Sequence, residues 1–300
     1  MQIERFAAAF AVACLTLAAM PASAATLDRI RESGSIKLGY LPDARPFSFQ
    51  TGSGAAEGYA VALCQQVADQ VKKGLQLSSL RVEWVPVTPD DRLSAVQQGN
   101  IDLLCAPTSA TLARRQDVSF SIPILAGGNR AVVRANAPAV LREALSESPS
   151  PRAVWRGAPA AKVLKGTSIA VVSGTTSAKW LEGRRAALQV DARIVPVADY
   201  RSGLQQLLDG KVDVFFGERS IVLGALSDSE REDLVLVDRL FTHEPLALAL
   251  ARGDEDFRLL VDRSLSQLYA SNEFSELYKR WFGEFDDRTR TYFIWNTPGE

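Results

Sequence analysis

Histidine and cysteine are scarce in this chain, which argues against most metal and haem chemistry. Among 300 residues there is one histidine, His243, and there are three cysteines, Cys14, Cys64 and Cys105. Zinc and haem proteins use closely spaced cysteine and histidine ligands, and no such spacing occurs here. A lone histidine also offers no Ser-His-Asp or Cys-His catalytic set. We therefore expect neither a metal nor a cofactor.

A marked excess of charge of either sign is also missing. The chain has 34 Lys and Arg against 35 Asp and Glu, for a net charge of -1. Without a basic run, neither nucleic acid nor an anionic membrane surface is an expected partner. Beyond the N-terminal segment, no apolar stretch is long enough to span a bilayer. A balanced surface of this kind suits a carrier of small solutes without proving it.

The N-terminal segment has the order of a secretory signal. Arg5 precedes an apolar run over residues 6–20, and Ala22-Ser23-Ala24 follows as a small-residue exit. The run is shorter than the roughly 20 residues that a spanning helix needs, which disfavours an uncleaved anchor. Lipid attachment at Cys14 is disfavoured because the apolar run continues past it. We expect residues 1–24 to be a signal peptide that is cleaved at its end, and the mature protein to be periplasmic.

The rest of the chain alternates short apolar runs with amphipathic helical stretches, which is typical of an α/β fold. The order strand, helix, strand, helix, strand occurs twice. The first unit has expected strands at 36–40, 81–87 and 101–105 and helices at 59–73 and 89–98, and the second has strands at 168–172, 193–197 and 212–216 and helices at 178–188 and 201–208. The length that remains after cleavage suits two domains.

Two segments interrupt this alternation. Residues 42–58 are rich in Pro, Gly and Ser, and we expect them to form a loop. Residues 134–166 hold four prolines and are expected to be a surface insertion with one helix at 140–145. Two α/β units joined in this way would place a ligand cleft between them, at the carboxyl ends of parallel strands.

A series of short motifs runs through residues 26–285. In order, they are Pro46-Phe47-Ser48-Phe49; Gly58-Tyr59-Ala60-Val61-Ala62-Leu63; Gly99-Asn100-Ile101-Asp102; Thr108-Ser109-Ala110-Thr111-Leu112-Ala113-Arg114-Arg115 with Val118-Ser119-Phe120-Ser121; Gly174-Thr175-Thr176; Gly210-Lys211-Val212-Asp213; and Asp256-Phe257 with Tyr278-Lys279-Arg280-Trp281-Phe282-Gly283. Their order and spacing resemble the extracellular solute-binding proteins of family 3, the polar amino acid receptors of ABC transporters. Two positions depart from that family: Ala62 stands where an Asp is usual, and Pro107 replaces a small polar residue. These departures put the solute class in question more than the fold.

The resemblance implies the two-lobed, venus-flytrap fold of type II periplasmic binding proteins, in which a hinge motion closes two lobes around a ligand. Lobe one is expected to combine residues 25–124 with residues 248–300, and lobe two to comprise residues 125–247 with the 134–166 insertion. The expected function is capture of an amino acid or similar small polar solute for an ABC transporter, whose membrane subunits would be partners. A monomer is expected.

Arg114 is the residue expected to bind a ligand carboxylate. A planar guanidinium matches two carboxylate oxygens at once, and the family's arginine aligns here. The alternative is a solvated arginine, as its neighbour Arg115 is expected to be. Thr108 and Ser109 could give hydroxyl groups to the same carboxylate or accept from an ammonium group. Their other interpretation is that of ordinary turn residues.

The second unit is expected to supply further polar contacts. Thr175 and Thr176 follow a strand and precede a helix, where backbone N–H groups favour an anion. A plain N-cap is the alternative there. Glu218 stands where the family often places an aspartate that pairs with the ligand ammonium, and it could meet Arg219 instead.

Two aromatic side chains are candidates for the apolar part of the cleft. Phe47 could stack on the solute or cap the cleft, and a core position is its alternative. Tyr40, at the end of the first expected strand, is a weaker candidate.

Two cysteines remain after signal cleavage, and an oxidising compartment favours their pairing. Cys64 lies on the core-facing side of the expected helix at 59–73, and Cys105 lies at the end of the expected strand at 101–105. Such elements pack together in a βαβαβ unit, so we expect a disulfide between helix and sheet in lobe one. Two buried free thiols are the alternative.

Two other functions stay open on the sequence. Some relatives in this family are periplasmic cyclohexadienyl dehydratases, and Glu218 could be the general acid of such an enzyme if burial raised its pKa. A ligand-free accessory protein would keep the fold and use surfaces such as 134–166 or 286–300 for contacts. A thermal-shift screen against amino acids separates receptor from accessory protein, because a ligand that binds only the folded state raises its melting temperature.

Overall fold

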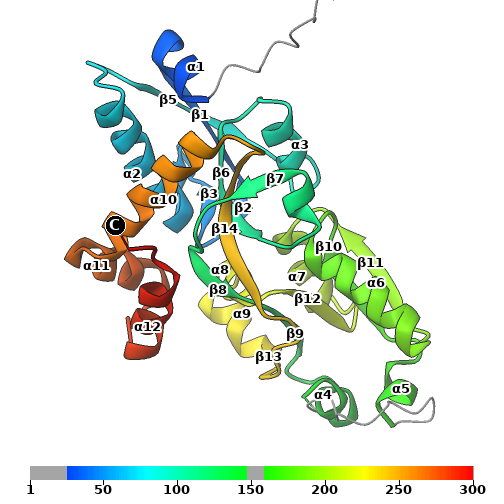
Figure 1. Cartoon of the computed structure of the whole chain (residues 1–300). Helices are drawn as coiled ribbons and strands as arrows, with labels where there is room; N and C mark the ends of the chain where they lie inside the picture. Colours follow the sequence, from blue (N-terminus) through cyan, green and yellow to red (C-terminus); the bar gives the residue numbers. More distant parts are fainter. Residues whose placement is uncertain (1–25, 147–158, 300) are drawn as a thin grey trace, which may run out of the picture.

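The computed structural model describes residues 26–146 and 159–299 of the chain. The expected signal peptide, residues 1–24, lies outside the described residues. The described chain forms two groups of strands, each flanked by helices, and Figure 1 shows one group above the other. Within the described ranges, every helix is too short or too polar to cross a membrane.

The first sheet has six strands in the described residues. They are β1 (Ser35–Tyr40), β5 (Arg81–Pro86), β6 (Leu103–Ser109), β7 (Val118–Phe120), β8 (Leu125–Gly127) and β14 (Glu244–Ala251). The order is β5-β1-β6-β14-β7, with β8 also paired to β14. β1 is parallel to β5 and β6, and β14 is antiparallel to β6. Every residue of β6 is buried, as expected for a central strand covered on both faces.

The second sheet has five strands in the described residues. They are β9 (Asn129–Arg134), β10 (Ser168–Val172), β11 (Arg193–Val197), β12 (Val214–Glu218) and β13 (Leu234–Leu236). The order is β11-β10-β12-β9-β13. β10 is parallel to β11 and β12, whereas β9 is antiparallel to β12. We call each sheet with its helices a lobe, the first lobe for β1 and the second lobe for β10.

The chain passes between the lobes twice in the described residues. It leaves the first sheet after β8 and enters the second at β9, so the first crossing lies between Gly127 and Asn129. It returns between β13 and β14, after Leu236 and before Glu244. The expected lobe boundaries at 124/125 and 247/248 stay a prediction, and the strand pairing places both changes of sheet a few residues away from them.

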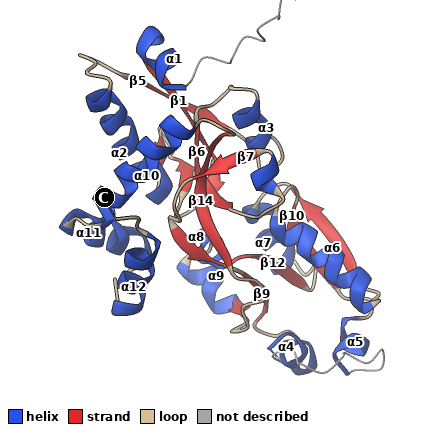
Figure 2. Ribbon diagram, in the orientation of Figure 1, coloured by secondary structure: helices blue, strands red, loops and turns tan. Residues whose placement is uncertain are grey.

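Helices cover both sheets, with the strands between them (Figure 2). The first lobe carries α1 (Thr26–Ser33), α2 (Tyr59–Gly74), α3 (Arg92–Gln97), the 3₁₀ turn η1 (Arg114–Gln116), α10 (Glu255–Tyr269), α11 (Asn272–Phe282) and α12 (Asp287–Asn296). The second lobe carries α4 (Ala139–Ser146), α5 (Pro159–Leu164), α6 (Thr176–Leu188), α7 (Tyr200–Leu208), α8 (Arg219–Ala225) and α9 (Asp228–Asp233). α2 buries Ala60, Cys64, Val67 and Val71, which recur at helical spacing.

Several elements differ from the sequence-based expectation. The segment 42–58 is not simply a loop, because it holds a small antiparallel sheet of β2 (Asp43–Ala44), β3 (Ser48–Gln50) and β4 (Ala56–Glu57). The helix expected at 89–98 begins only at Arg92. The strand expected at 101–105 runs on to Ser109, through Pro107, with all of its side chains buried.

Within the first lobe, a disulfide joins Cys64 on α2 to Cys105 on β6, the pair named from the sequence. The two Cα atoms are 6.0 Å apart, and both side chains are fully buried. This crosslink holds the first long helix against the central strand of the first lobe.

Candidate ligand-binding cleft

A cavity of about 460 Å³ lies between the two lobes. From the first lobe it is lined by the segments that follow β1 and β5 and by the end of β6; from the second it is lined by segments that follow β10, β11 and β12. These are the carboxyl ends of the parallel strands, where α/β sheets gather polar groups for a ligand. Its polar lining includes Asp43, Asp90, Arg92, Ser109, Arg114, Asn129, Thr175, Thr176, Ser177, Asp199, Tyr200 and Glu218.

Arg114 lines this cavity from η1, directly after β6. Its Nη1 donates to the backbone carbonyl of Ser109 at 3.2 Å, and its Nη2 donates across the cleft to the carbonyl of Gly174 at 3.3 Å. Burial lowers the pKa of Arg114, while the nearby carboxylate of Glu244 raises it. A guanidinium has five N–H groups, so N–H groups remain for an anionic ligand.

The turn after β10 approaches the first lobe closely. Gly174 has φ of +67°, and a Cβ atom there would lie 2.3 Å from Oδ1 of Asp90. Thr175 is the N-cap of α6, because its hydroxyl accepts from the N–H of Ala178 at 3.2 Å. The hydroxyl of Thr176 donates to Glu244 at 2.8 Å and lies 3.2 Å from that of Ser109. The turn therefore has hydrogen bonds of its own and faces the cavity.

Glu218 is the last residue of β12 and the N-cap of α8. The two oxygens of its carboxyl group differ in their hydrogen bonding. Oε2 accepts from the N–H of Ile221 at 2.9 Å, whereas Oε1 is buried and has no hydrogen-bond partner among the described residues. The residue is 8% exposed, and burial raises its pKa to about 7. Backbone N–H groups, first that of Ile221, and then the charge of Arg219 lower this pKa, but burial has the larger effect. No ion pair joins Glu218 to Arg219 among the described residues.

Two charged residues that the sequence analysis did not name form hydrogen bonds with the turn after β10. Arg92 is 4% exposed, and its Nη2 donates to the carbonyl of Gly174 at 3.4 Å. Burial lowers the pKa of Arg92 to about 10, with repulsion from Arg114 as the next cause. Glu244, on β14, accepts from Thr176 at 2.8 Å and from the amide of Asn129 at 3.4 Å. Neither Arg92, at the start of a helix, nor Glu244, before a proline, belongs to a recognisable motif. The sequence alone therefore offers no signal for either residue.

Three residues expected in the cleft lie elsewhere. Phe47 is fully buried, with its ring centroid 5.4 Å from that of Phe282, which is the core position named as its alternative. Tyr40 packs edge-on against Trp84, at 6.3 Å between centroids. Thr108 donates to the carbonyl of Ala106 at 3.2 Å and is fully buried.

The strand geometry explains the different positions of Thr108 and Ser109. Successive side chains of a β-strand point to opposite faces. Because β6 continues to Ser109, only one of these two neighbours can face the cavity, and it is Ser109. The sequence analysis treated both as turn residues, for which no such alternation applies.

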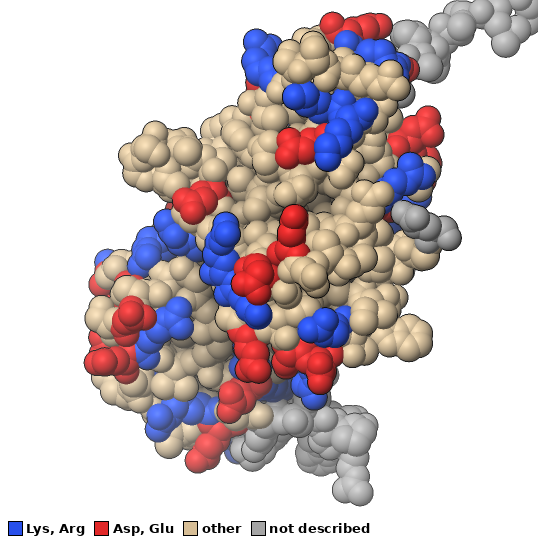
Figure 3. Space-filling view, turned by 90° about the vertical axis from the view of Figure 1, so that its left-hand side faces the viewer, with Lys and Arg blue, Asp and Glu red and all other residues tan. Residues whose placement is uncertain are grey.

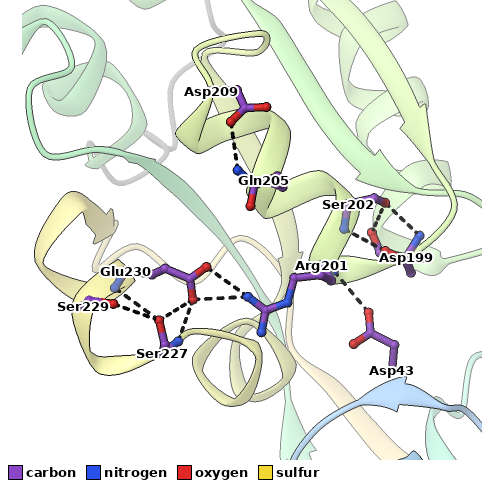
Figure 4. A network of polar contacts seen from close by, with 9 residues as sticks. All are labelled: Asp43, Asp199, Arg201, Ser202, Gln205, Asp209, Ser227, Ser229 and Glu230. Carbon is purple, nitrogen blue, oxygen red and sulfur yellow. Dashed lines mark hydrogen bonds and ion pairs between the residues drawn. The ribbon is translucent and has the colours of Figure 1, made fainter.

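The lobes also contact each other beside the cleft, where Figure 4 shows Arg201 of α7 close to Asp43 of β2. The backbone N–H of Arg201, at the start of α7, donates to the carboxylate of Asp43 on β2 at 3.1 Å. The side chain of Arg201 pairs with Glu230 at 3.0 Å within the second lobe. Burial raises the pKa of Asp43, and the hydrogen bond from Arg201 lowers it. This contact and those of Arg92 and Arg114 with Gly174 connect the lobes across the cavity.

No group of three or more His, Cys, Asp or Glu that could hold a metal ion occurs in the described ranges. The surface seen in Figure 3 has basic and acidic side chains interspersed, with no large patch of one sign. Chemically, the cleft offers the buried guanidinium group of Arg92 and the partly buried one of Arg114. It also offers hydroxyl groups from both lobes, the buried carboxyl group of Glu218 and three more exposed aspartates. These groups suit a small solute that carries both anionic and cationic parts.

Comparison of the sequence with models of protein families identifies the family of this chain. The model of the bacterial extracellular solute-binding proteins, family 3, matches residues 36–284. The chain belongs to this family.

Individual relatives of this family agree with that assignment. The L-glutamate/L-aspartate-binding protein of Pseudomonas aeruginosa is 28% identical over 259 residues, which are 86% of this chain and 80% of the relative. Cyclohexadienyl dehydratase from the same organism is 27% identical over 276 residues, covering 90% and 92%. The crystal structure of the ancestral amino acid-binding protein AncCDT-1, a precursor of cyclohexadienyl dehydratase, superposes with a TM-score of 0.69 at 25% identity, covering 86% and 100%. The two-lobed fold expected from the motifs is thereby confirmed.

Proposed function

We propose that this protein is a periplasmic receptor that captures an amino acid between its lobes and delivers it to an ABC transporter. The binding specificity of the Pseudomonas aeruginosa relative supports this proposal, since that protein binds L-glutamate and L-aspartate. Delivery would involve the membrane subunits of the transporter, and the receptor would act as a monomer. The secretory signal expected at residues 1–24 supports the periplasmic location.

The observation that carries the proposal is the position of Arg114. Its guanidinium lines the cavity and touches both lobes, through the carbonyls of Ser109 and Gly174. A ligand carboxylate bound by Arg114 would therefore hold the closed arrangement of the lobes. In the same cavity, the buried Oε1 of Glu218 would accept from the ligand ammonium. One group for each charge of an α-amino acid is thus available in the cleft.

Arg92 extends the proposal to the side chain of the solute. Its Nε is buried and has no hydrogen-bond partner among the described residues, and its charge is close enough to that of Arg114 to lower its own pKa. A second carboxylate near these two cations would reduce their repulsion and pair the buried charge. We therefore propose an acidic amino acid as the solute, with Arg92 close to its side-chain carboxylate.

The test is a calorimetric titration of the mature protein with glutamate, aspartate, glutamine and arginine. Arg114→Ala should weaken binding by about 10- to 100-fold, the usual range for a lost charge-assisted contact, while the ligand-free protein keeps its melting temperature. Arg115→Ala is the matched control, because this neighbour is exposed and lies outside the lining of the cleft. Equal binding by both variants would contradict the assignment of Arg114.

The same titrations test the acidic specificity. Arg92→Gln should weaken binding of glutamate more than binding of glutamine, since only glutamate brings a second negative charge. If all the amino acids fail to bind the wild-type protein, the receptor proposal itself is wrong, and an accessory role becomes the better explanation.

A dehydratase is the second candidate, favoured by Glu218. A carboxyl group whose pKa is raised to about 7 by burial is partly protonated at neutral pH and could act as a general acid in the cleft. The cyclohexadienyl dehydratase of Pseudomonas aeruginosa is a relative over most of its length. Loss of a cyclohexadienyl substrate, followed by its ultraviolet absorbance with wild-type protein and with Glu218→Gln, decides this point. A rate that matches the buffer blank removes this candidate.

A further inference from the structure

A second cavity, of about 410 Å³, lies next to the two chain crossings. It is lined by Gly127 and Gly128 at the first crossing and by His243 at the second, and α12 contributes Tyr292 and Asn296. Glu218 lines both this cavity and the cleft. We call this cavity the rear pocket. Because both crossings and both lobes line it, its shape depends on how the lobes are arranged.

Several residues that line the rear pocket have a buried polar atom without a hydrogen-bond partner among the described residues. These atoms are Nε of Arg130, Oε1 of Glu218 and the hydroxyl of Tyr292. They come from β9, β12 and α12, so no single local irregularity accounts for them. Buried polar groups in folded proteins have hydrogen-bond partners as a rule, which points to a polar occupant of this pocket.

The two arginines of the pocket have little opposing charge. The carboxylate nearest to Arg130 is that of Asp238, at 3.9 Å, and that side chain is fully exposed to solvent. In the described part of the chain, Arg219 makes no ion pair with a carboxylate. The two guanidinium groups repel each other, which adds to the effect of burial in lowering the pKa of Arg130.

Neither acidic residue of the pocket forms an ion pair with Arg130 or Arg219 among the described residues. The carboxylate oxygens of Glu244 instead accept hydrogen bonds from the cleft side, one from Thr176 and the other from Asn129. Glu218 is 8% exposed, and its burial favours the protonated form, in which the carboxyl group donates a hydrogen bond. His243, the only histidine of the chain, also lines the pocket and adds no negative charge.

We propose that the rear pocket is a second binding site, which takes a small oxyanion such as a carboxylate or inorganic phosphate between Arg130 and Arg219. Planar guanidinium groups bind such oxygens through paired N–H donors. The hydroxyl of Tyr292 lies at the same pocket and supplies a further donor.

The site has a consequence for the cleft that rests on the proposed receptor function. Glu218 is the one residue that both cavities share in their described linings. An anion in the rear pocket favours hydrogen-bond donation by Glu218, whereas a ligand ammonium in the cleft favours its ionised form. The two ligands therefore compete through one proton, and each should weaken the binding of the other.

Thermal unfolding of the mature protein tests the site directly. Sodium phosphate and sodium acetate are titrated in separate series, each at an ionic strength held constant with sodium chloride. At about 100-fold excess over the dissociation constant, the effective anion should raise the melting temperature by about 5 °C in a saturable way. The two series show which kind of oxyanion the pocket binds, because a phosphate site responds to phosphate alone and a carboxylate site responds to acetate.

Two variants and one control make the test specific. Arg130→Gln and Arg219→Gln should each lose the response to the anion. Arg185→Gln should keep it, because Arg185 is exposed, pairs with Glu182 on α6 and lies outside both cavities. If Arg130→Gln fails to fold by circular dichroism, Arg219→Gln alone decides. An equal response in all variants, or no response of the wild-type protein to either anion, overturns the proposal. Bound water would then be the better explanation for the polar atoms of the pocket.

The two proposals fail separately. Binding of glutamate to Arg130→Gln is measured by calorimetry in a buffer without oxyanions. The receptor function predicts binding there, since Arg130 does not line the cleft. Weaker binding of glutamate to the wild-type protein in the presence of the effective anion, and no such weakening in Arg130→Gln, would support the coupling through Glu218.

Discussion

Replacing Glu218 with glutamine should remove a specific pH dependence of the stability of the ligand-free protein. Burial raises the pKa of this carboxyl group from its ordinary value of 4.5 to about 7. Between these values the folded protein holds a proton that the unfolded chain has lost. The contribution of Glu218 to stability is therefore fully present below pH 4.5 and is lost as the pH rises to 7. A difference of 2.5 units at 1.36 kcal/mol each gives about 3 kcal/mol.

Urea unfolding between pH 5 and pH 8 measures this effect. The free energy of unfolding of the wild-type protein should fall across this range by about 2 to 3 kcal/mol more than that of Glu218→Gln, because most of the effect lies above pH 5. Glutamine keeps the oxygen that accepts from the N–H of Ile221, so the cap of α8 stays in place. Glu230→Gln is a suitable control, because Glu230 also accepts from a backbone N–H at a helix start, that of Ser227, but its hydrogen bonds lower its pKa.

Ligand binding gives an independent measurement of the same proton. In the proposed function an amino acid ammonium pairs with the ionised form of Glu218, so binding near pH 6 should release about one proton. Calorimetric titrations in buffers with different ionisation enthalpies report that number. Parallel stability profiles for the wild type and Glu218→Gln, together with no proton release, would refute both the burial argument and the role of Glu218 in the cleft.

Two further predictions concern the contact between the lobes at Asp43 and the disulfide of the first lobe. Asp43→Ala removes the carboxylate that accepts from the backbone N–H of Arg201 in the other lobe at 3.1 Å. This change should weaken ligand binding roughly tenfold by destabilising the closed form. Glu182→Ala, on the surface of α6, should bind as the wild type does. Replacing Cys64 and Cys105 together with serine should lower the free energy of unfolding by roughly 2–4 kcal/mol, measured in urea, because their bond closes a loop of 41 residues. An unchanged unfolding midpoint would show that the bond does not constrain the unfolded chain.

Many of the parallel strands and their helices could be predicted from the sequence, because each has a characteristic pattern of apolar residues within a short segment. α2 shows its buried stripe at helical spacing, and β10 is a short run of apolar residues bounded by polar ones. The antiparallel strands β9 and β14 were not predicted. β9 ends at Arg134, where the segment expected to be an insertion begins, and β14 is paired with β6, far away in the sequence. Such long-range pairing has no local signature in a single sequence.

The residues of the cleft could likewise be predicted where a local motif contains them, but not where their position depends on contacts with distant parts of the chain. Arg114, Ser109 and Thr176 were found because they belong to motifs with a known order. Arg92 was missed because its burial depends on contact with Gly174 in the other lobe. Phe47 also belongs to a motif, yet it is held in the core by Phe282, from a helix far along the chain. A motif thus identifies residues near the cleft, and only the packing decides which of them face it.

Burial of Arg92 and Arg114 links binding to closure in the proposed function. Both guanidinium groups donate to the carbonyl of Gly174 in the other lobe, and burial lowers the pKa of each. Bringing the lobes together therefore removes water from two cations that repel each other, and a neutral carbonyl offsets little of that cost. A solute carboxylate opposes both charges at once, so its presence shifts the equilibrium towards the closed form. A neutral solute of the same size fills the cavity without that effect, which is why the charge of the ligand should control closure more than its volume does.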